Sequence, residues 1–302
     1  MKQELLSPTN DFVFQYLFGS EENKGILISL LSAILQIQIK SLKLLPREIP
    51  RSAEDLKSAI LDITAELGDG TRIDVEMQCA FQPEYIDRVL FYWADFFTVQ
   101  LKKSKEHRQL NKTISISIIK DSKNFFPHVH SIYVLTEKQG NPRHVLTDKI
   151  EFHIIDLSRI AEIIKNEDNK MFVLWMKFFT TDKREEMELL AKEHKCIEEA
   201  YNRLDYMSQD EQIRNAANAR DKFWWDFEVA TQAEREKGRE EGREEGREEG
   251  REEGIEIGEK RGIEIGREEG RIESAKKLIA NGMDPKAICE MLGISQSDLT
   301  WE

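Results

Sequence analysis

The sequence predicts an α/β domain, with a mixed sheet flanked by helices, followed by an all-helical C-terminal tail. Three observations support this fold class. Residues 58–78 carry a strong β-hairpin signal. A long amphipathic helical pattern follows the hairpin and leads into a buried strand. Glycine then recurs at every fourth position between residues 238 and 270, within a separate and highly charged segment. The first two features are typical of a sheet covered by helices.

Length and composition set the outer limits. The 302 residues, 40% of them apolar, are enough for one sizeable domain with appendages or for two domains. Cys79, Cys196 and Cys289 are scattered and odd in number, which fits neither a disulfide framework nor a zinc cluster. No charged-then-apolar leader opens the chain and no apolar run nears the length of a membrane span. We therefore expect a cytoplasmic protein without a membrane partner.

The charge is unevenly distributed. The formal net charge of −13 argues against a nucleic-acid partner, but residues 1–150 hold 19 basic and 19 acidic side chains, so the whole excess lies in residues 151–302. The neutral half is free to carry a local basic surface, for which the candidates are Lys102, Lys103, Lys105, His107, Arg108 and Lys112. These residues either follow a phosphate backbone or form a solvated helix end, where cations also favour the dipole.

The N-terminal region reads as two helices. Ser7-Pro8-Thr9-Asn10-Asp11 is a helix-start signal, and apolar side chains follow it at helical spacing. Asp11 either contributes a carboxylate to a site or only caps this helix. Residues 26–39 are strongly apolar and predict a second, largely buried helix. Residues 40–57 are predicted to be a charged connection into the hairpin.

The hairpin consists of strands over residues 58–67 and 71–78, joined by a Gly68-Asp69-Gly70 turn. A three-residue loop places Leu67 opposite Thr71 and therefore Asp62 opposite Glu76. Side chains alternate between faces, so one face is apolar and must pack on a core: Leu61, Ile63, Leu67, Ile73, Val75 and Met77.

The other face of the hairpin gathers acidic side chains. Gln78 lies one step from the Asp62–Glu76 pair, and Asp74 lies beside it. Like charges directly opposed across a ladder are unfavourable. Glu66 and Arg72 form a plausible cross-strand ion pair, whereas the Asp62–Glu76 pair has no local counter-charge. A hard divalent cation supplies one, since Mg²⁺ takes one or two carboxylates together with water and phosphate oxygens. The alternative is an ordinary antiparallel sheet with one solvated face.

The remaining elements complete a domain of residues 1–180. Residues 85–110 form a long amphipathic pattern, which suits a crossover helix, and residues 113–119 form a buried strand. Residues 131–136 and 149–156 predict a further strand pair, and residues 157–166 and 170–179 are helix-like.

Four pieces of the sequence, in this order, resemble one family: SPTNDFVFQYLFG, NKGILISLLSAIL, LDITAELGDGTRIDVEMQ and RVLFYWADFFTVQL. They are similar to the recombination-promoting nucleases, also described as transposases, of the PD-(D/E)XK nuclease superfamily. The resemblance covers essentially the whole chain. It implies a restriction-endonuclease-like core in which an acid on one hairpin strand and a Glu-x-Lys or Glu-x-Gln on the next hold Mg²⁺ for phosphodiester hydrolysis.

Carried over residue by residue, the resemblance assigns catalytic roles to Asp62, Glu76, Gln78 and Asp11. It implies metal ligation by Asp62, Glu76 and the Met77 carbonyl, with Mg²⁺ or another divalent cation such as Mn²⁺ or Ca²⁺. Three cations are expected to contact substrate phosphate: Arg88, Lys102 and Lys103. Arg88 has the alternative of a salt bridge to Glu84 or Asp87. Two positions depart from the family pattern: Gln15 stands where a lysine is expected, and Asp74 stands where asparagine is frequent.

The C-terminal part is predicted to be helical throughout. Residues 181–230 read as a connector whose aromatic residues 223–227 dock on the core or a partner, with nucleobase stacking as an alternative. In residues 231–272, glycine at every fourth position lets two helices approach closely, which predicts a homo-oligomer; a solvated spacer is the alternative. Residues 273–302 form a small helix-turn-helix-like module, with Gly282 and Gly293 as stops and a Ser295-x-x-Asp298 capping box before a final helix of about seven residues.

The sequence therefore predicts a metal-dependent DNA endonuclease of low sequence specificity, without a nucleotide cofactor. Two alternatives stay open. One is a catalytically weak DNA-binding or recombination accessory protein. The other is an oligomerising interaction protein without nuclease activity.

Overall fold

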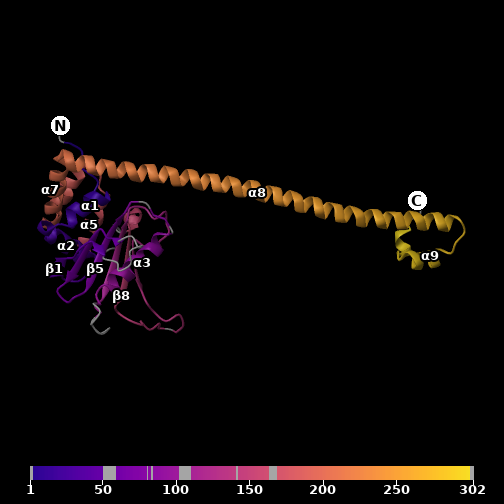
Figure 1. Ribbon diagram of the computed structural model, residues 1–302, viewed down its shortest axis with the longest axis horizontal. Coiled ribbons are helices and arrows are strands. Elements are labelled where there is room, and N and C mark those ends of the chain that lie inside the picture. Colours follow the sequence, from indigo (N-terminus) through magenta and orange to yellow (C-terminus); the bar gives the residue numbers. More distant parts are fainter. Residues whose placement is uncertain are drawn as a thin grey trace. The chain divides into compact units, whose positions relative to one another are not determined.

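The computed structural model describes residues 3–49, 59–79, 81–82, 84–101, 110–140, 142–162 and 169–299. The chain divides into two compact units, Met1–Glu228 and Val229–Glu302, and Figure 1 labels their helices and strands. None of the helices in these ranges has the length and apolar character that crossing a bilayer requires.

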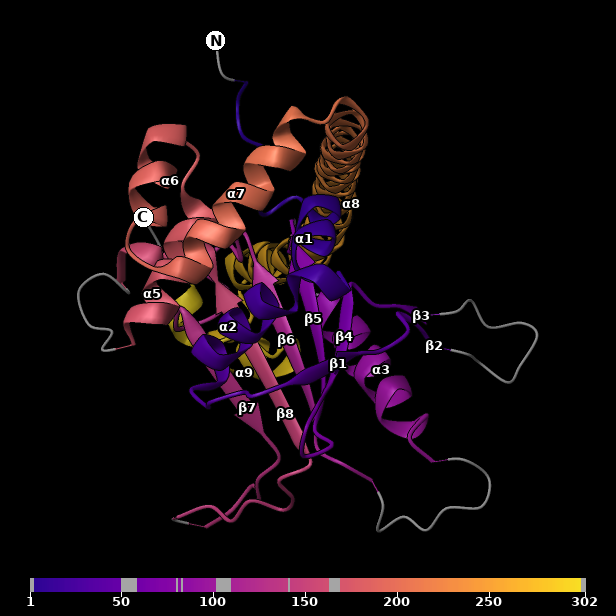
Figure 2. The same ribbon diagram turned by 90° about the vertical axis from the view of Figure 1, so that its left-hand side faces the viewer.

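A six-stranded mixed sheet lies at the centre of the first unit, in the order β1-β4-β5-β6-β8-β7 (Figure 2). Its strands are β1 (Leu42–Leu44), β4 (Ile63–Leu67), β5 (Arg72–Gln78), β6 (Thr113–Ile119), β7 (His130–Val134) and β8 (Ile150–Asp156). The pairs β5–β6 and β6–β8 are parallel, and the other pairs are antiparallel. Helix α3 (Tyr85–Thr98) connects β5 to the parallel β6, so the predicted crossover and the mixed sheet are confirmed.

The hairpin of β4 and β5 has the predicted register. Ile63 pairs with Val75 and Glu66 with Arg72, and the Leu67 amide donates to the Thr71 carbonyl at 2.8 Å. The turn needs glycine at position 70, where φ is +86°. Arg72 Nε lies 3.3 Å from Glu66 Oε2, which confirms the cross-strand ion pair.

The first hairpin strand is shorter than predicted. Instead of one strand over 58–67, β3 (Ala59–Ile60) and β4 are separated by a bend at residues 61–62, and β3 pairs with β2 (Glu48–Ile49) in a sheet of its own. Residue 58 lies outside the described ranges. As a result Leu61 packs against Phe96 of α3, while the rest of the predicted apolar face lies in the main core.

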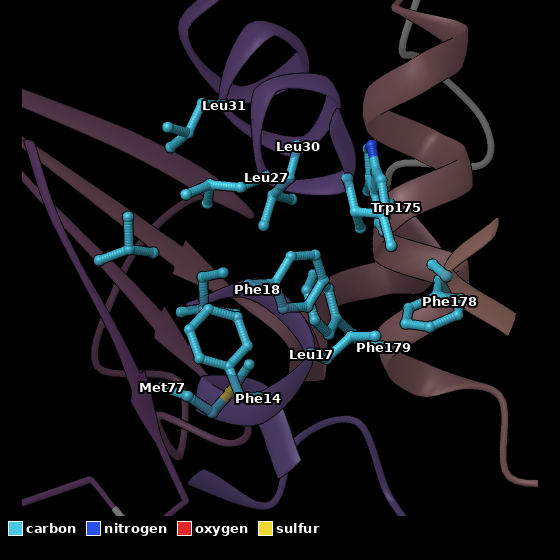
Figure 3. Packing of buried hydrophobic residues seen from close by; sticks show 14 of the residues in the cluster. Phe14, Leu17, Phe18, Leu27, Leu30, Leu31, Met77, Trp175, Phe178 and Phe179 are labelled. Carbon is cyan, nitrogen blue, oxygen red and sulfur yellow. The ribbon is translucent and has the colours of Figure 1, made fainter. Parts of the chain in front are cut away.

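The main core covers one face of the sheet. It is formed by α1 (Asp11–Phe18), α2 (Lys24–Leu35), α5 (Lys170–Thr180), α6 (Arg184–Ala191) and α7 (Lys195–Gln209). Asn10 begins α1 as its N-cap, with its side chain accepting from the Val13 amide. Figure 3 shows the aromatic rings of Phe14, Phe18, Trp175 and Phe179 packed with the leucines of α2. This packing holds α1 against the sheet at the end of β5.

Helix α3 covers the opposite face. The Trp93 Nε1 group donates to the Thr113 carbonyl at 3.0 Å, and the Arg72 guanidinium lies 5.8 Å from the centroid of the Phe96 ring. The polar face of the hairpin is consequently not solvated, since Thr64, Asp74 and Gln78 are buried. This burial contradicts the alternative of an ordinary sheet with a wet face.

Several predicted boundaries are wrong. Helix α2 ends at Leu35 instead of residue 39, because Gln36 adopts a left-handed conformation with φ of +54°. The predicted connection over residues 40–57 contains β1 and β2. Helix α3 ends at Thr98 instead of residue 110, because the Gln100 side chain turns to bond Thr113 Oγ1 and the Asn111 amide, each at 2.9 Å. The segment from residue 157 begins as a 3-10 helix, η3 (Leu157–Arg159), and residues 163–168 lie outside the described ranges.

Helix α8 (Glu211–Ala280) contains every glycine of the four-residue repeat, as the helical prediction requires. In the single chain, a Cβ atom added at Gly238 or at any of the eight following repeat glycines meets nothing within 4 Å. The chain then turns at Gly282 into α9 (Pro285–Leu292), which Asp284 caps and Gly293 ends. Where a final α-helix was expected, the described residues form a three-residue 3-10 helix, η4 (Gln296–Asp298), and residues 300–302 lie outside the described ranges. The Ser295 amide does donate to Asp298, as a capping box predicts.

Candidate functional site

Three acidic side chains gather around the end of the hairpin. The β4–β5 ladder stops at the Ile63–Val75 pair, and Asp62, in the bend just before β4, accepts the Met77 amide with its Oδ2 at 3.0 Å. Asp74 lies on the α3 side of β5, where its Oδ2 accepts from Ser115 Oγ on β6 at 3.0 Å. Glu76 lies two residues further along β5, on the same side of the strand as Asp74. The structure therefore brings Asp62, Asp74 and Glu76 into one neighbourhood.

Burial and mutual repulsion raise the pKa values of these carboxyls. Loss of hydration raises the pKa of Asp62 to about 6 and that of Asp74 to about 7. The pKa of Glu76 is raised well above its ordinary value, first by burial and then by the charges of Asp62 and Asp74. The site thus favours either bound protons or a bound cation.

Two of the carboxylate oxygens have no hydrogen-bond donor. Asp74 Oδ1 and Glu76 Oε1 are buried without a partner, an arrangement that is costly unless a proton or a cation compensates it. A third oxygen faces the same region. The Gln78 carbonyl accepts from Lys120 on the β6 side, so the Met77 carbonyl and amide point to the opposite side of β5, toward Asp62.

This donor set fits a hard divalent cation. Two carboxylates and a backbone carbonyl are oxygen ligands of the kind that Mg²⁺ takes while keeping several waters. Within the described ranges, no three His, Cys, Asp or Glu side chains are placed so that they could hold a metal ion together. A cation here would therefore take at most two of these carboxylates and complete its coordination with the backbone carbonyl, water or substrate oxygens.

Gln78 and Arg88 lie next to the acids. Gln78 is the last residue of β5 and is buried, and its Oε1 accepts from Arg88 Nη2 at 2.8 Å. The guanidinium also lies 5.0 Å from the centroid of the Tyr85 ring, while Tyr85 Oη donates to Ser117 Oγ at 2.9 Å. Arg88 thus turns toward the candidate site instead of toward Glu84 or Asp87, the alternative that the sequence left open.

Asp11 is an anchor for the first turns of α8. Its Oδ2 accepts from Arg220 Nε at 2.6 Å and from Trp224 Nε1 at 3.1 Å, and its Oδ1 accepts from the Phe12 amide at 2.8 Å. The N-cap is Asn10, so the expectation that Asp11 caps the helix is wrong. Asp11 does lie close enough to Asp62 for its charge to raise the pKa of that carboxyl.

Aromatic residues of α8 border the same region. Phe223, Trp224 and Phe227 line a cavity of about 300 Å³ together with Gln78, Tyr85 and Arg88. The Trp224 indole is tied to the core through Asp11, whereas Phe223 remains 52% exposed and Trp225 68% exposed. The predicted docking of residues 223–227 on the core therefore holds for Trp224 but not for every ring of the cluster.

Most of the basic stretch cannot be placed relative to the site. Lys102, Lys103, Lys105, His107 and Arg108 lie outside the described ranges. Lys112, the remaining member, forms an ion pair with Glu151 on β8.

Sequence reasoning missed Ser115, Tyr85 and Arg220. Ser115 and Ser117 alternate with isoleucine in a run otherwise read as a buried strand, and that alternation was a usable signal for a polar patch. Arg220 carried no local signal, because its partner Asp11 lies 209 residues away.

A comparison with known protein families identifies the family of this chain. The chain matches the family described as PD-(D/E)XK nuclease family transposase over residues 8–234. That range includes the hairpin, the acids around it, Asp11 and the aromatic residues of α8. Searches of curated proteins and of solved structures find no match.

Proposed function

Because the chain belongs to the PD-(D/E)XK nuclease family transposases, we propose that it is a Mg²⁺-dependent DNA endonuclease that hydrolyses phosphodiester bonds with low sequence specificity. The observation that carries this proposal is the buried group of Asp62, Asp74 and Glu76, in which the pKa values are raised and two oxygens lack a hydrogen-bond donor. A group of acids whose charges are only partly compensated by neighbouring residues is what a cation site requires.

In this proposal Asp62, Glu76 and the Met77 carbonyl hold the divalent cation, with Mn²⁺ or Ca²⁺ as possible substitutes. Such a cation, when bound, polarises the scissile phosphate and lowers the pKa of a bound water. Two neighbouring side chains are proposed to position the water and the phosphate. Gln78 does not titrate, so it orients water or phosphate through its amide. Arg88, exposed at the rim, donates to a phosphate oxygen and offsets its negative charge.

Low sequence specificity follows from the kind of contacts available. Arg88 is the cation that lines the cavity beside Gln78, and phosphate contacts position a protein on DNA without reading its sequence. Phosphate contacts by Lys102 and Lys103 remain predictions of the same kind.

Plasmid nicking tests this function directly. We expect the purified full chain to convert supercoiled plasmid to nicked and linear forms with Mg²⁺ or Mn²⁺. EDTA should stop the reaction, and excess Mg²⁺ should restore it, because the acids need a cation to act on phosphate. Nicking that ignores chelation would contradict the proposal. The control for contaminating nuclease is the variant Glu76→Gln, purified in the same way.

A second candidate is a catalytically weak DNA-binding or recombination accessory protein. The observation that favours it is Gln78, whose amide adds no positive charge toward phosphate and is already bonded to Arg88. In the same assay, binding of DNA without nicking would support this candidate. Neither binding nor nicking would support the third one, an interaction protein that assembles through its tail.

The proposal includes self-association through residues 231–272. Each glycine there costs the helix about 1 kcal/mol relative to alanine, and no contact within the single chain accounts for the repeat. We expect the full chain to sediment as a dimer or larger oligomer. Replacing Gly242, Gly246 and Gly250 by alanine should raise helix content and yet shift the chain toward monomer, because Cβ atoms keep paired helices apart. A wild-type chain that sediments as a monomer contradicts the pairing.

We place this activity in the cytoplasm and without a nucleotide cofactor. Cys79, Cys196 and Cys289 are free thiols, which supports a reducing compartment.

A further inference from the structure

The cavity beside Gln78 has two chemically different sides. One side is polar and is formed by the end of β5, the loop after it and α3, with Gln78, Gln82, Glu84, Tyr85 and Arg88. The other side is aromatic and is formed by α8, with Phe223, Trp224 and Phe227. Its volume of about 300 Å³ lies at the lower end of the range for small-molecule sites. It therefore suits one small planar group, and a continuous duplex is too large for it.

The aromatic side consists of three rings at defined angles to one another. The rings of Phe223 and Phe227 are nearly parallel, with an interplanar angle of 16° and centroids 6.4 Å apart. Trp224 stands almost perpendicular to Phe227, at 89°. Phe223 is 52% exposed and Phe227 is 40% exposed, so both side chains leave part of their surface accessible to a ligand.

Polar contacts hold this aromatic side in place. Asp11 accepts from both Arg220 and Trp224, and the Arg220 guanidinium lies 5.3 Å from the centroids of both the Phe223 and the Trp224 rings. The aromatic side is thus fixed to the core beside the candidate site by an ion pair, an indole hydrogen bond and cation–π contacts.

We propose that this cavity takes one unpaired nucleobase of a DNA substrate, stacked on Phe223 and Phe227, while Arg88 contacts the attached phosphate. The inference rests on the proposed nuclease function and adds a substrate class to it. Aromatic side chains bind bases of any sequence because every base has a π-face. Inside a duplex those faces are covered by neighbouring bases, so the base must be single-stranded or turned out of the helix. The substrate class is therefore DNA with ends, bulges or single-stranded stretches, in preference to continuous duplex.

Binding measurements without cleavage test this assignment. The full chain is titrated in EDTA against three fluorescein-labelled probes of equal length: a single-stranded oligodeoxynucleotide, its duplex, and an abasic strand that keeps the phosphates but lacks bases. We expect the wild type to bind the single strand most tightly. The double variant Phe223→Ala/Phe227→Ala should lose roughly 5- to 150-fold of that affinity, the loss expected for removing base stacking, and should no longer distinguish the single strand from the abasic strand.

Two further variants make the test specific. Trp225→Ala removes an aromatic ring that is 68% exposed in the same turn of α8 but does not line the cavity, so it should bind like the wild type. Phe223→Leu/Phe227→Leu keeps apolar bulk for folding but removes the π-faces, and it should lose affinity as the alanine variant does. Circular dichroism and thermal unfolding confirm that each variant is folded.

Three results would overturn the assignment. They are equal wild-type binding of single and abasic strands, full affinity in the leucine variant, and no measurable binding of any probe. Since the readout needs no cleavage, a chain that passes this test but never nicks plasmid contradicts only the nuclease proposal. A chain that nicks plasmid but shows no base-dependent binding contradicts only the stacking inference.

Discussion

Replacing Glu76 by glutamine is expected to abolish Mg²⁺-dependent nicking while making the folded chain more stable. The substitution keeps the shape of the side chain but removes a charge from a cation site. Loss of groups that merely support metal ligands costs on the order of 10- to 100-fold in activity, so loss of a ligand itself should cost at least the upper end of that range. Stability should rise because the pKa of Glu76 is raised by burial and by Asp62 and Asp74, which means that its ionised form destabilises the fold.

The measurement is plasmid nicking in parallel with thermal unfolding in EDTA. Asp62→Asn is the companion variant and should lose nicking to a similar degree, since its amide oxygen still accepts from Met77 but carries no charge. Glu66→Gln is the matched control. Glu66 lies on the same hairpin but pairs with Arg72, so this variant should nick DNA like the wild type. Nicking that survives both Asp62→Asn and Glu76→Gln would remove these residues from the mechanism.

The second large effect concerns Asp74. In EDTA, Asp74→Asn should unfold at a higher temperature than the wild type above pH 7, and the two chains should converge only as the pH falls below about 4, near the ordinary pKa of this carboxyl. An amide still offers an oxygen to the Ser115 hydroxyl but removes the charge that faces Asp62 and Glu76.

The sign follows from proton binding. The folded chain holds the Asp74 proton up to a pKa of about 7, against an ordinary value of 3.8. Wild-type stability therefore falls as the pH rises from about 4 to about 7, because the unfolded chain has released this proton while the folded chain still holds it. A tenfold change in proton binding is worth about 1.4 kcal/mol, so the full cost above pH 7 is roughly 4 kcal/mol. In a domain of this size each kcal/mol corresponds to roughly 2–4 °C in Tm.

Thermal unfolding of both chains between about pH 3.5 and pH 8, an interval that includes both the ordinary and the raised pKa of Asp74, checks this prediction. Asp69→Asn, in the exposed hairpin turn, is the control and should show no comparable pH-dependent difference. An Asp74→Asn effect of the same size at both ends of the interval would mean that the carboxyl does not titrate there. Mg²⁺ added to the wild type at the higher pH should recover part of the lost stability, because a ligand that binds only the folded state stabilises it.

The hairpin shows how far local sequence determines structure. Its register depends on loop length and on the period of two, and both are visible in residues 58–78. The bend at residues 61–62 was not predictable in the same way, because it depends on the separate β2–β3 pairing. The end of α3 at Thr98 likewise depends on Gln100 reaching Thr113 and Asn111, contacts that helical periodicity does not record.

The candidate site likewise has a part that local sequence predicts and a part that depends on long-range contacts. Asp62, Asp74, Glu76 and Gln78 lie close in sequence, so alternation along two strands was enough to group them. The contacts of Asp11 with Arg220 and Trp224 were not accessible from the sequence, since these residues lie more than 200 positions away and are brought to it only by helix packing. Long-range polar contacts of this kind have no signature in spacing or composition.

Asp62 carries a constraint of its own. One of its oxygens replaces the missing rung at the end of the β4–β5 ladder, while the residue also borders the acids proposed to carry chemistry. A substitution at this position therefore affects both the hydrogen bond that closes the hairpin and the proposed cation site. Asparagine keeps an oxygen for the Met77 amide but lacks the charge, and alanine lacks both. Under the proposed mechanism, a folded but inactive descendant is expected to carry asparagine at position 62.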